Sequence, residues 1–336
     1  MQAAIWLNTC VMEYYWTMSG IKEATKKMLP DFAVQAVRRL KHLIQSSNRL
    51  VGMTSKSEQE FYRRCVKDSA DLEGAIADLG CWMGSTTISL AKGLSDGHSE
   101  FSRHIYAFDQ FIWEEWMTPY KGVVRRNYRV GDSFFEEVQQ RLSRWSDNIT
   151  LTRADLSTYE WTGGAIGILL VDAMKDWSLA SSIAKNFYPH LSERSILIHQ
   201  DFKHYFTPWI HIVQYRLRHC FDLLEDVSGG ATVAFRCVKR PTPEELTIAT
   251  RFEATSEQEL CEVFSYSIAS VNTSQKSAVA AAHVMYFVHM EQPDAAARQV
   301  ALYRTENLPE TVDFQLAETA VDELLRRNPE PPYANH

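Results

Sequence analysis

The spacing of hydrophobic residues changes at Ala75, and the change predicts two kinds of structure. Before Ala75, the stretch 31–44 (DFAVQAVRRLKHLI) places apolar residues three and four positions apart, and the helical stretch 57–66 begins on Ser57, a typical cap. After it, short apolar runs alternate with helical patterns, at 75–80, 104–109, 148–154, 166–172 and 195–201. Because strands buried on both faces read as continuous apolar runs, this alternation predicts a parallel sheet between layers of helices.

Two more strand patterns, 221–227 and 231–240, flank Ser228-Gly229-Gly230, which predicts a turn between antiparallel strands. The predicted fold is therefore α/β, a doubly wound and mostly parallel sheet with a terminal antiparallel hairpin. We assign residues 75–240 to this Rossmann-like domain and residues 1–74 to a helical segment before it.

Prolines mark the start of a third segment, 241–336, which reads as helical. Pro241 and Pro243 are too close together for a helix interior or a central strand, and Pro293 and Pro309 predict breaks between later helices. The apolar run 277–290 is too short to span a bilayer and predicts a buried helix. The last residues, NPEPPYANH, predict a disordered tail.

Composition narrows the class of protein. The chain has 336 residues, a net charge of −7 and 45% hydrophobic residues, which predicts a globular protein and argues against a nucleic-acid partner. Its six cysteines contain no C-x-x-C pair, which argues against a zinc ribbon or a disulfide scaffold. The first residues lack the pattern of a signal peptide. We therefore predict a soluble, cytoplasmic protein with reduced thiols and no membrane partner.

A candidate ligand site lies at the turn after the first predicted strand, in DLGCWMGSTT (78–87). Asp78, Gly80 and Gly84 form the pattern acid-x-Gly-x-x-x-Gly, and open α/β sheets bind ligands at the carboxyl ends of their strands. The pattern lacks the Gly-Lys-Ser/Thr of a P-loop and the third glycine of G-x-G-x-x-G. Tight packing of a strand against a helix is the alternative interpretation of these glycines.

Two further acids follow the next predicted strands. Asp109 is positioned to accept hydrogen bonds from ribose hydroxyls, although a helix cap is its alternative role. Asp155, in TRADLS, could accept from an adenine amino group. A ligand with an amino-acid end, a ribose and an adenine would use all three corners, and S-adenosylmethionine is such a ligand.

The three motifs DLGCWMGSTT, IYAFDQF and RADLS resemble, in this order, motifs I, II and III of class I S-adenosylmethionine-dependent methyltransferases. The resemblance covers roughly residues 60–240 and implies a cofactor site with the methionine end at the glycine turn, the ribose at Asp109 and the adenine near Asp155. The predicted cofactor-binding residues are Asp78, Gly80, Trp82, Gly84, Ser85, Thr86, Asp109, Gln110, Asp155 and Leu156.

A second constellation follows in LLVDAMKDW and ILIHQDF. Asp172 and Asp201 end strands that we expect to be neighbours, about 5 Å apart, so that both carboxylates could reach one cation. Hard divalent ions such as Mg²⁺ take oxygen ligands and would orient a substrate oxygen toward the methyl group. Without a metal, His199, His204 or Lys175 would have to act as the base alone, although a lone histidine at a strand end is more often structural.

VDAMKD resembles the motif of catechol-type and caffeoyl-CoA-type metal-dependent O-methyltransferases, and the frame 171–202 resembles the macrocin O-methyltransferase family. The resemblance implies that Asp172 binds metal and that Lys175 is the base, so the predicted catalytic residues are Asp172, Lys175 and His199. The predicted metal ligands are Asp172, Gln200 and Asp201. Gln200 and Phe202 stand where the two families have a ligand, which weakens the metal prediction.

Two aromatic stretches, 110–131 and 202–216, leave the carboxyl ends of strands and are expected to overhang the site. Aromatic faces suit flat or sugar rings, whereas packing as a lid or as a homodimer contact is the alternative. The leading hypothesis is an S-adenosylmethionine-dependent O-methyltransferase, with possible magnesium assistance, that acts on a hydroxyl of a sugar or phenolic natural product. The alternatives are a non-catalytic protein of the same fold with a regulatory or scaffold role, and an NAD-binding enzyme, which the missing third glycine disfavours.

Overall fold

A computed structural model describes residues 52–97 and 103–327 of the chain, which belong to one compact unit. The predicted helix at 31–44, the amino-terminal residues and the predicted tail lie outside the described residues. Within the described part of the chain, no helix combines the length and the apolar character needed to cross a bilayer.

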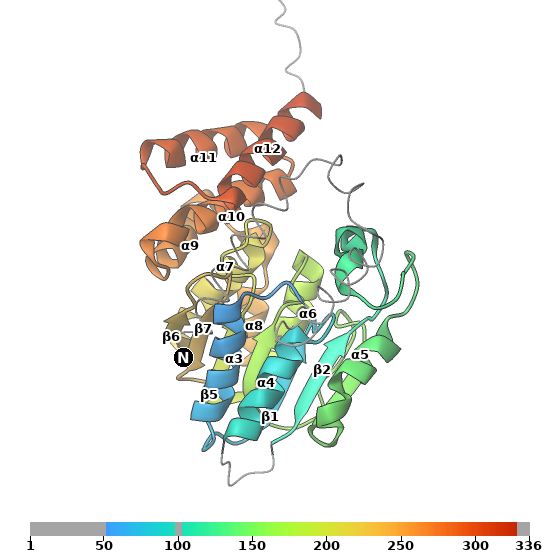
Figure 1. Cartoon of the computed structure of the whole chain (residues 1–336). Helices are drawn as coiled ribbons and strands as arrows, with labels where there is room; N and C mark the ends of the chain where they lie inside the picture. Colours follow the sequence, from blue (N-terminus) through green and yellow to red (C-terminus); the bar gives the residue numbers. More distant parts are fainter. Residues whose placement is uncertain (1–51, 98–102, 328–336) are drawn as a thin grey trace, which may run out of the picture. The chain divides into compact units, whose positions relative to one another are not determined.

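The described residues contain a seven-stranded sheet in the order β3-β2-β1-β4-β5-β7-β6 (Figure 1). The strands β1 to β5 pair in parallel, and β7 runs antiparallel to both β5 and β6. This topology confirms the predicted fold class, a doubly wound Rossmann-like sheet that ends in an antiparallel hairpin. The strands are β1 (Ala75–Leu79), β2 (Ile105–Asp109), β3 (Ile149–Arg153), β4 (Ile166–Val171), β5 (Leu191–His199), β6 (Phe221–Asp226) and β7 (Val233–Cys237).

Helices cover both faces of the sheet because successive strand residues point to opposite sides. Ile168 and Leu170 pack in one core cluster with residues of α3 and α4, whereas Leu169 and Val171 pack in the other with residues of α6 and α7. The helices flanking the sheet are α3 (Lys56–Asp68), α4 (Ser85–Asp96), η2 (Glu115–Val123), α5 (Phe135–Leu142), η3 (Ser143–Asn148), α6 (Trp177–Phe187), η4 (Tyr188–His190), α7 (Pro208–Arg216) and η5 (Arg218–Cys220).

The cap of α3 differs from the sequence-based prediction. Ser55, rather than Ser57, accepts from the Glu58 N–H group at 3.2 Å, and Glu58 accepts in return from the Ser55 N–H group at 2.7 Å. The other oxygen of Glu58 accepts from the backbone N–H groups of Ala231 and Thr232 in the β6–β7 turn. The buried Glu58 carboxylate is fixed by the β6–β7 turn, which is far away in the sequence. Because Ser55 lies three residues before Glu58, Ser55 rather than Ser57 completes the capping box.

The described residues after β7 are helical, and α10 is the core of this region. Nearly all of α10 is buried, which confirms the predicted buried helix at 277–290. Pro293 begins α11 and Pro309 separates α11 from α12, as the sequence predicted. The elements are α8 (Pro243–Ala249), η6 (Phe252–Ala254), α9 (Glu257–Ala269), η7 (Thr273–Gln275), α10 (Lys276–His289), α11 (Pro293–Thr305) and α12 (Val312–Arg327).

The carboxyl-terminal helices lie beyond the edge of the sheet where the parallel strands end (Figure 1). They contact the loop that follows β5 at two points. Asp313, in the first turn of α12, accepts from the Tyr205 N–H group at 3.0 Å, and His289 Nε2 lies 3.1 Å from the Phe206 carbonyl oxygen. The helical region is therefore attached to a loop that borders the predicted site.

Candidate active site

The strand register brings most of the predicted site residues to one edge of the sheet. Leu79 pairs with Phe108 on one side and with Val171 on the other, and Val171 pairs with His199. The residues that follow these positions therefore emerge together at the carboxyl edge. They include the glycine turn, Asp109, Asp172 and the 200–201 pair.

The two glycines of the turn are explained by the chain itself. Gly80 has φ of +87°, and a Cβ atom at this position would lie 2.6 Å from the Asp172 carbonyl oxygen. Gly84, with φ of +84°, is the left-handed residue that precedes α4. Both conformations favour glycine. Close approach of β4 therefore accounts for Gly80, and the turn into α4 accounts for Gly84, before any ligand is considered.

Asp78 is fully buried beneath this turn. Its Oδ2 atom accepts from the hydroxyls of Thr86 at 2.9 Å and Thr87 at 2.6 Å, whereas its Oδ1 atom has no hydrogen-bond partner within the described residues. Burial raises the pKa of Asp78 to about 6, against the effect of the two hydroxyls. The Asp78 carboxylate therefore has two neutral donors on Oδ2, and its Oδ1 atom can accept a further hydrogen bond.

Asp109, at the end of β2, holds the glycine turn and the following loop together. Its Oδ2 atom accepts from the Trp82 N–H group at 2.9 Å, and its Oδ1 atom accepts from the Phe111 N–H group at 2.8 Å. Burial raises the pKa of Asp109, and the two backbone hydrogen bonds act against this shift. Each oxygen retains a lone pair for another donor, so the position suits a ligand with hydroxyl groups.

The remaining predicted cofactor residues have different surroundings. Thr86 is engaged with Asp78, and Ser85 accepts from the Thr54 hydroxyl at 3.2 Å. Asp155 is exposed and accepts from the Ser157 hydroxyl and N–H group, which lower its pKa. Gln110 is exposed, whereas Leu156 is buried in the core.

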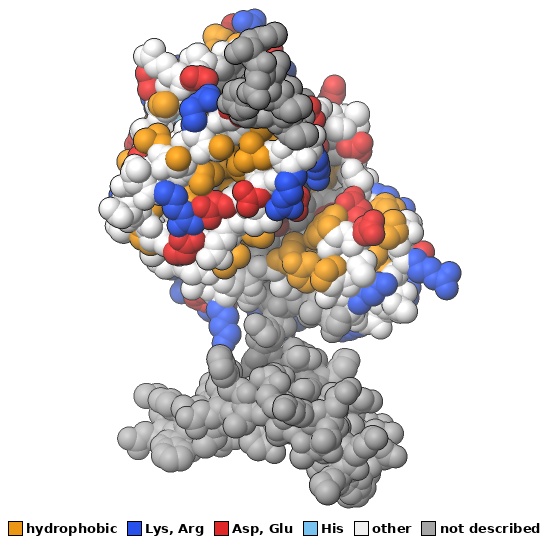
Figure 2. Space-filling view, turned by 90° about the horizontal axis from the view of Figure 1, so that it is seen from above, with side chains coloured by type: hydrophobic (Ala, Val, Ile, Leu, Met, Phe, Trp, Pro, Cys, Tyr) orange, Lys and Arg blue, Asp and Glu red, His pale blue; other side chains and the backbone are white. Residues whose placement is uncertain are grey.

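Aromatic side chains cover the glycine turn. Trp82 is 7% exposed, and its ring centroid lies 6.2 Å from that of Trp116 and 5.5 Å from that of Tyr120. Trp116 and Tyr120 come from η2 and expose 48% and 36% of their surface. Figure 2 shows the face seen from above Figure 1, where hydrophobic side chains lie among charged ones. The sequence indicated an aromatic stretch here, but which rings contact Trp82 depends on the path of η2.

The second constellation forms around Lys175. Its Nζ atom lies 2.8 Å from Asp172 Oδ1 and contacts Asp201 Oδ2. The two aspartates expose 12% and 14% of their side chains, and the lysine about half. The sequence predicted that the ends of β4 and β5 would bring two carboxylates to one metal ion. In the structure these ends do bring Asp172 and Asp201 to one cation, and that cation is the ammonium group of Lys175.

The charges of this trio are coupled. Burial raises the pKa of Asp172 to about 8, with a further contribution from the charge of Asp201. Desolvation opposes the charge on Lys175, but the two carboxylates outweigh it and raise the pKa of this ammonium. Burial acts against ionisation of Asp201 as well, and Lys175 and His204 outweigh it, so that the pKa of Asp201 is lowered.

A contact that the sequence did not indicate supports the loop between Asp172 and Lys175. The indole Nε1 of Trp209, on α7, donates to the Met174 carbonyl oxygen at 2.6 Å. Trp209 also packs against His289 of α10, with ring centroids 5.3 Å apart. The carboxyl-terminal helices therefore contact the residue that positions this loop. No local pattern around Trp209 announces a contact with a residue 35 positions earlier.

His199 and Gln200 point away from the two carboxylates. His199 is fully buried, its Nε2 atom lies 3.3 Å from the Tyr188 hydroxyl, and burial lowers its pKa to about 3. The Gln200 Oε1 atom accepts from the Tyr62 hydroxyl of α3 at 3.4 Å. Their predicted roles as base and metal ligand stay untested, and neither side chain has a polar contact with Asp172 or Asp201 in the described residues.

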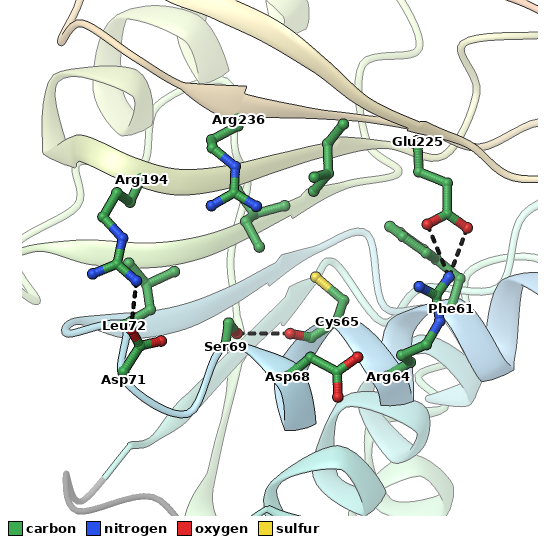
Figure 3. Close-up of a pocket in the computed structure, with 12 residues that line it drawn as sticks. Phe61, Arg64, Cys65, Asp68, Ser69, Asp71, Leu72, Arg194, Glu225 and Arg236 are labelled. Carbon is green, nitrogen blue, oxygen red and sulfur yellow. Dashed lines mark hydrogen bonds and ion pairs between the residues drawn. The ribbon is translucent and has the colours of Figure 1, made fainter.

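A separate cavity of about 230 Å³ lies between α3 and the strands β5, β6 and β7 (Figure 3). Its arginines include Arg64, which pairs with Glu225 at 2.6 Å, and Arg194, which pairs with Asp71 at 2.5 Å. Arg194 lies in the amino-terminal half of β5, so the cavity is remote from the carboxyl edge. The predicted site residues do not line it.

Comparisons with known proteins add a likeness of fold. No family model matches the chain, and no curated protein matches it. The solved O-methyltransferase NovP is similar at 18% identity over 57% of this chain and 84% of that one, with a TM-score of 0.45. The calicheamicin methyltransferase CalS11 follows at 14% identity over 60% and 91%, with a TM-score of 0.42. The S-adenosylhomocysteine-bound PaMTH1 from Podospora anserina shows 15% identity over 63% and 99%, with a TM-score of 0.37. At such identities a shared fold does not imply a shared activity.

Proposed function

We propose that this chain is a methyltransferase that binds S-adenosylmethionine at the glycine turn and transfers a methyl group to a hydroxyl oxygen of a small molecule. The observation that carries the proposal is the pair of acids formed by buried Asp78 and partly buried Asp109, which accept hydrogen bonds from hydroxyl and amide donors beside the N-terminus of α4. S-Adenosylmethionine offers a positive sulfonium, an ammonium and ribose hydroxyls to such acids. Its carboxylate suits the positive end of a helix.

The same acids argue against a dinucleotide. A pyrophosphate carries two negative charges and would approach Asp78, Asp109 and Asp172 at adjacent strand ends. Repulsion between these charges would oppose its binding in a site of low polarity. A ligand with a net positive charge would instead favour the ionised carboxylates, whose pKa values are raised by burial.

The proposed cofactor contacts follow from these positions. Asp109 accepts from the ribose hydroxyls, Asp78 and Gly80 line the methionine end, and the first backbone N–H groups of α4 face its carboxylate. Trp82 covers the site together with Trp116 and Tyr120. We keep Gly84, Ser85, Thr86, Gln110, Asp155 and Leu156 as the other proposed cofactor residues.

The acceptor half requires alignment and removal of one proton, because the bound cofactor supplies a methyl group that is already activated. Asp172 suits the removal of the proton, since a pKa of about 8 lies near the operating pH. Lys175 remains protonated and offers positive charge to the oxygen that loses its proton. We therefore propose Asp172 as the base and Lys175 as the electrostatic partner, which reverses the roles implied by the family resemblance.

Two of the three predicted metal ligands, Asp172 and Asp201, are placed so that both could bind one divalent cation. The ammonium of Lys175 marks a position that both Asp172 and Asp201 reach, whereas Gln200 faces Tyr62 on another side. Mg²⁺ often binds through one or two carboxylates and keeps its remaining positions for water and substrate. Such an ion would lower the pKa of a bound hydroxyl, and Asp172 and Asp201 would be its ligands; with the ion bound, Asp172 would hold the metal instead of accepting the proton.

Titration calorimetry with S-adenosylhomocysteine tests the cofactor half. We expect a dissociation constant in the micromolar range, with no loss of affinity when Mg²⁺ is replaced by EDTA. Transfer from labelled S-adenosylmethionine to a panel of sugar and phenol acceptors then tests the reaction. Failure to bind under either condition would overturn the proposal.

A non-catalytic protein that retains the cofactor is the second candidate. It is favoured by the Lys175 bridge, which already occupies the two carboxyl groups that an acceptor or metal would use. Binding of S-adenosylhomocysteine without transfer to any acceptor, with and without Mg²⁺, would support this candidate over the first.

A further inference from the structure

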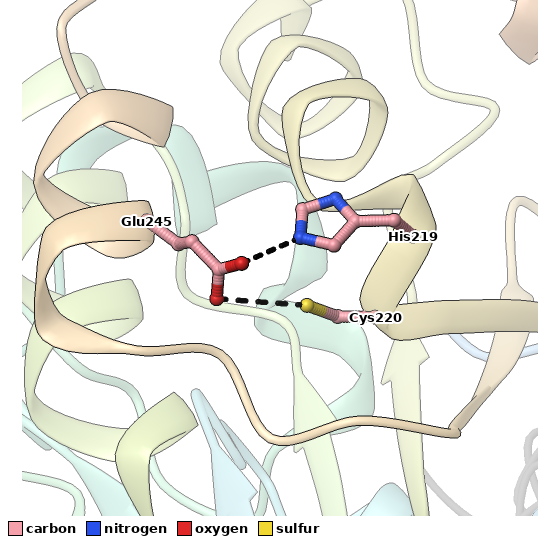
Figure 4. Close-up of side chains that lie close together, drawn as sticks. All are labelled: His219, Cys220 and Glu245. Atoms are coloured by element: carbon pink, nitrogen blue, oxygen red, sulfur yellow. Dashed lines mark hydrogen bonds and ion pairs between the residues drawn. The ribbon is translucent and has the colours of Figure 1, made fainter.

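A second group of polar side chains, His219, Cys220 and Glu245, lies close together (Figure 4). Because β6 and β5 are both antiparallel to β7, the start of β6 lies at the opposite edge of the sheet from the proposed active site. His219 and Cys220 end η5 just before β6 begins, and Glu245 lies in the first turn of α8. His219 Nε2 lies 2.7 Å from Glu245 Oε1, and Cys220 Sγ lies 4.0 Å from Glu245 Oε2. One candidate ligand atom from each residue lies within 4.8 Å of the other two.

We propose that these three residues bind a transition-metal ion of the zinc class, a site that is independent of the proposed methyl transfer. An imidazole nitrogen, a thiolate sulfur and a carboxylate oxygen are the donors that Zn²⁺ takes in tetrahedral sites, and a water molecule would complete the set.

The geometry requires a small adjustment. Zinc–ligand bonds of about 2.0–2.3 Å place tetrahedral ligand atoms roughly 3.3–3.6 Å apart. The His219–Glu245 hydrogen bond must therefore lengthen, and the ligand atoms of His219 and Glu245 must move toward the sulfur. The side chains of His219 and Glu245 expose 47% and 23% of their surface and have room to adjust, whereas Cys220 is buried and provides the fixed point.

The charges around the cluster determine what the ion must displace. Lys239 Nζ lies 2.7 Å from Glu245 Oε1 and lowers the pKa of Glu245 to about 2, together with the Thr242 N–H group and His219. The carboxylate is therefore ionised. Burial and the charge of Glu245 raise the pKa of the Cys220 thiol, so metal binding releases the thiol proton to solvent. The half-exposed Lys239 ammonium leaves Glu245 at the same time.

Metal binding would join two parts of the fold. Cys220 lies between α7 and β6, and α8 is the first helix after the strands. Glu245 already caps α8, because its Oε2 atom accepts from the Thr242 N–H group at 2.8 Å. A metal held by Oε1 leaves this cap intact and ties α8 to the sheet at the point where the carboxyl-terminal helical region begins.

Cobalt spectroscopy on the full-length, reduced protein tests the site. Co²⁺ added to the protein should produce a thiolate-to-cobalt charge-transfer band, together with the visible bands of a tetrahedral site, and Zn²⁺ should remove both. Cys220→Ser should abolish the charge-transfer band, and His219→Ala should weaken cobalt binding more than about tenfold. Lys239→Ala removes the competing ammonium and should tighten binding, with an unchanged circular dichroism spectrum.

Cys261→Ser is the matched control, because Cys261 is an exposed thiol on α9 outside the cluster. This variant should retain the full cobalt spectrum. A spectrum that survives Cys220→Ser, or that is lost in Cys261→Ser, would indicate an adventitious ion only and would overturn the proposal. Absence of a charge-transfer band in both the unmodified chain and the Lys239→Ala variant would overturn it as well, and these two proteins retain Cys220, so the result does not depend on whether Cys220→Ser folds.

Discussion

Two pairs of acids at one edge of the sheet have different partners. Asp78 and Asp109 accept hydrogen bonds from hydroxyl and amide groups and have no ion pair within the described residues. Asp172 and Asp201 share the ammonium of Lys175. The first pair has no charged partner within the described residues, whereas the second pair already holds a cation supplied by the chain.

This difference has a consequence for binding. A cationic cofactor can approach Asp78 and Asp109 without displacing a charged group, so its affinity is expected to depend little on changes around Lys175. An acceptor or a metal must instead compete with Lys175 for Asp172 and Asp201. The two halves of the proposed site should therefore respond separately to substitution and to pH.

The largest expected effect is on the second pair. Asp172→Asn keeps the shape of the side chain but removes its charge and its capacity to take a proton. Turnover with any acceptor that the unmodified chain methylates should fall by about 10²–10⁴-fold, while the affinity for S-adenosylhomocysteine changes less than about twofold. Asp176→Asn is the control, because asparagine caps helices as well as the aspartate that caps α6. Full turnover in Asp172→Asn would remove the functional distinction between the two pairs.

The next effect is on the first pair. Asp109→Asn would place an amide nitrogen against one of the backbone N–H groups of Trp82 and Phe111, and would lose the charge offered to the ribose. We expect affinity for S-adenosylhomocysteine to fall by about 1.5–3 kcal/mol, measured by calorimetry. Asp155→Asn retains an oxygen acceptor at an exposed position and should change the affinity far less. Equal losses in both variants would contradict the ribose assignment to Asp109, and thermal melting checks that the variants remain folded.

The pH dependence of binding separates the pairs further. Because burial raises the pKa of Asp78 to about 6, a cationic ligand must displace its proton at lower pH. The ratio of S-adenosylmethionine to S-adenosylhomocysteine affinity should therefore rise with pH, by up to about tenfold per unit below pH 6, and level off above it. Turnover should continue to rise toward pH 8, where Asp172 ionises. A ratio that stays constant from pH 5 to 8 would mean that the sulfonium does not sense Asp78.

The smallest expected effect concerns the aromatic cover over the first pair. Trp116→Ala removes a half-exposed ring that packs against Trp82. Aromatic pairs contribute about 0.5–1.5 kcal/mol, so affinity for S-adenosylhomocysteine should fall roughly two- to tenfold. Leu302→Ala, which truncates an exposed side chain on α11, is the control and should leave the affinity unchanged. A larger loss in the control variant would show that the rings over the turn do not cover the cofactor.

Much of the fold could be predicted from local patterns. The apolar runs located the strands to within a few residues, and prolines located the boundaries of α8 and α11. The first half of β5 was missed because Ser192, Glu193 and Arg194 have no strand pattern of their own. These residues continue the strand that starts at Leu191. Leu191 pairs with Ile166 of β4, and the register between the two strands shifts before the next pair, Ile168 and Ile196. Such a pairing is a property of two distant segments rather than of either one.

The site could be predicted less completely. The sequence identified acids at strand ends, and the register brings Asp109, Asp172 and Asp201 to one edge of the sheet. The sequence also offered His199, at the end of β5, as a base. Its side chain is fully buried and packs against Phe235, and its catalytic role stays a prediction. The supporting contact from Trp209 to Met174 depends on the packing of α7, which no spacing in the sequence reveals.

The sequence by itself therefore determined the alternation of strands and helices, the glycine turn and the acids that follow the strands, because periodicity and backbone preference are local properties. The tertiary structure decided which acids have only neutral donors and which are paired with Lys175. It also decided that burial raises the pKa of the Asp172 carboxyl. Burial and Coulomb interactions act between residues that meet only when the strands are assembled, and for that reason the chemistry of this edge depends on the fold.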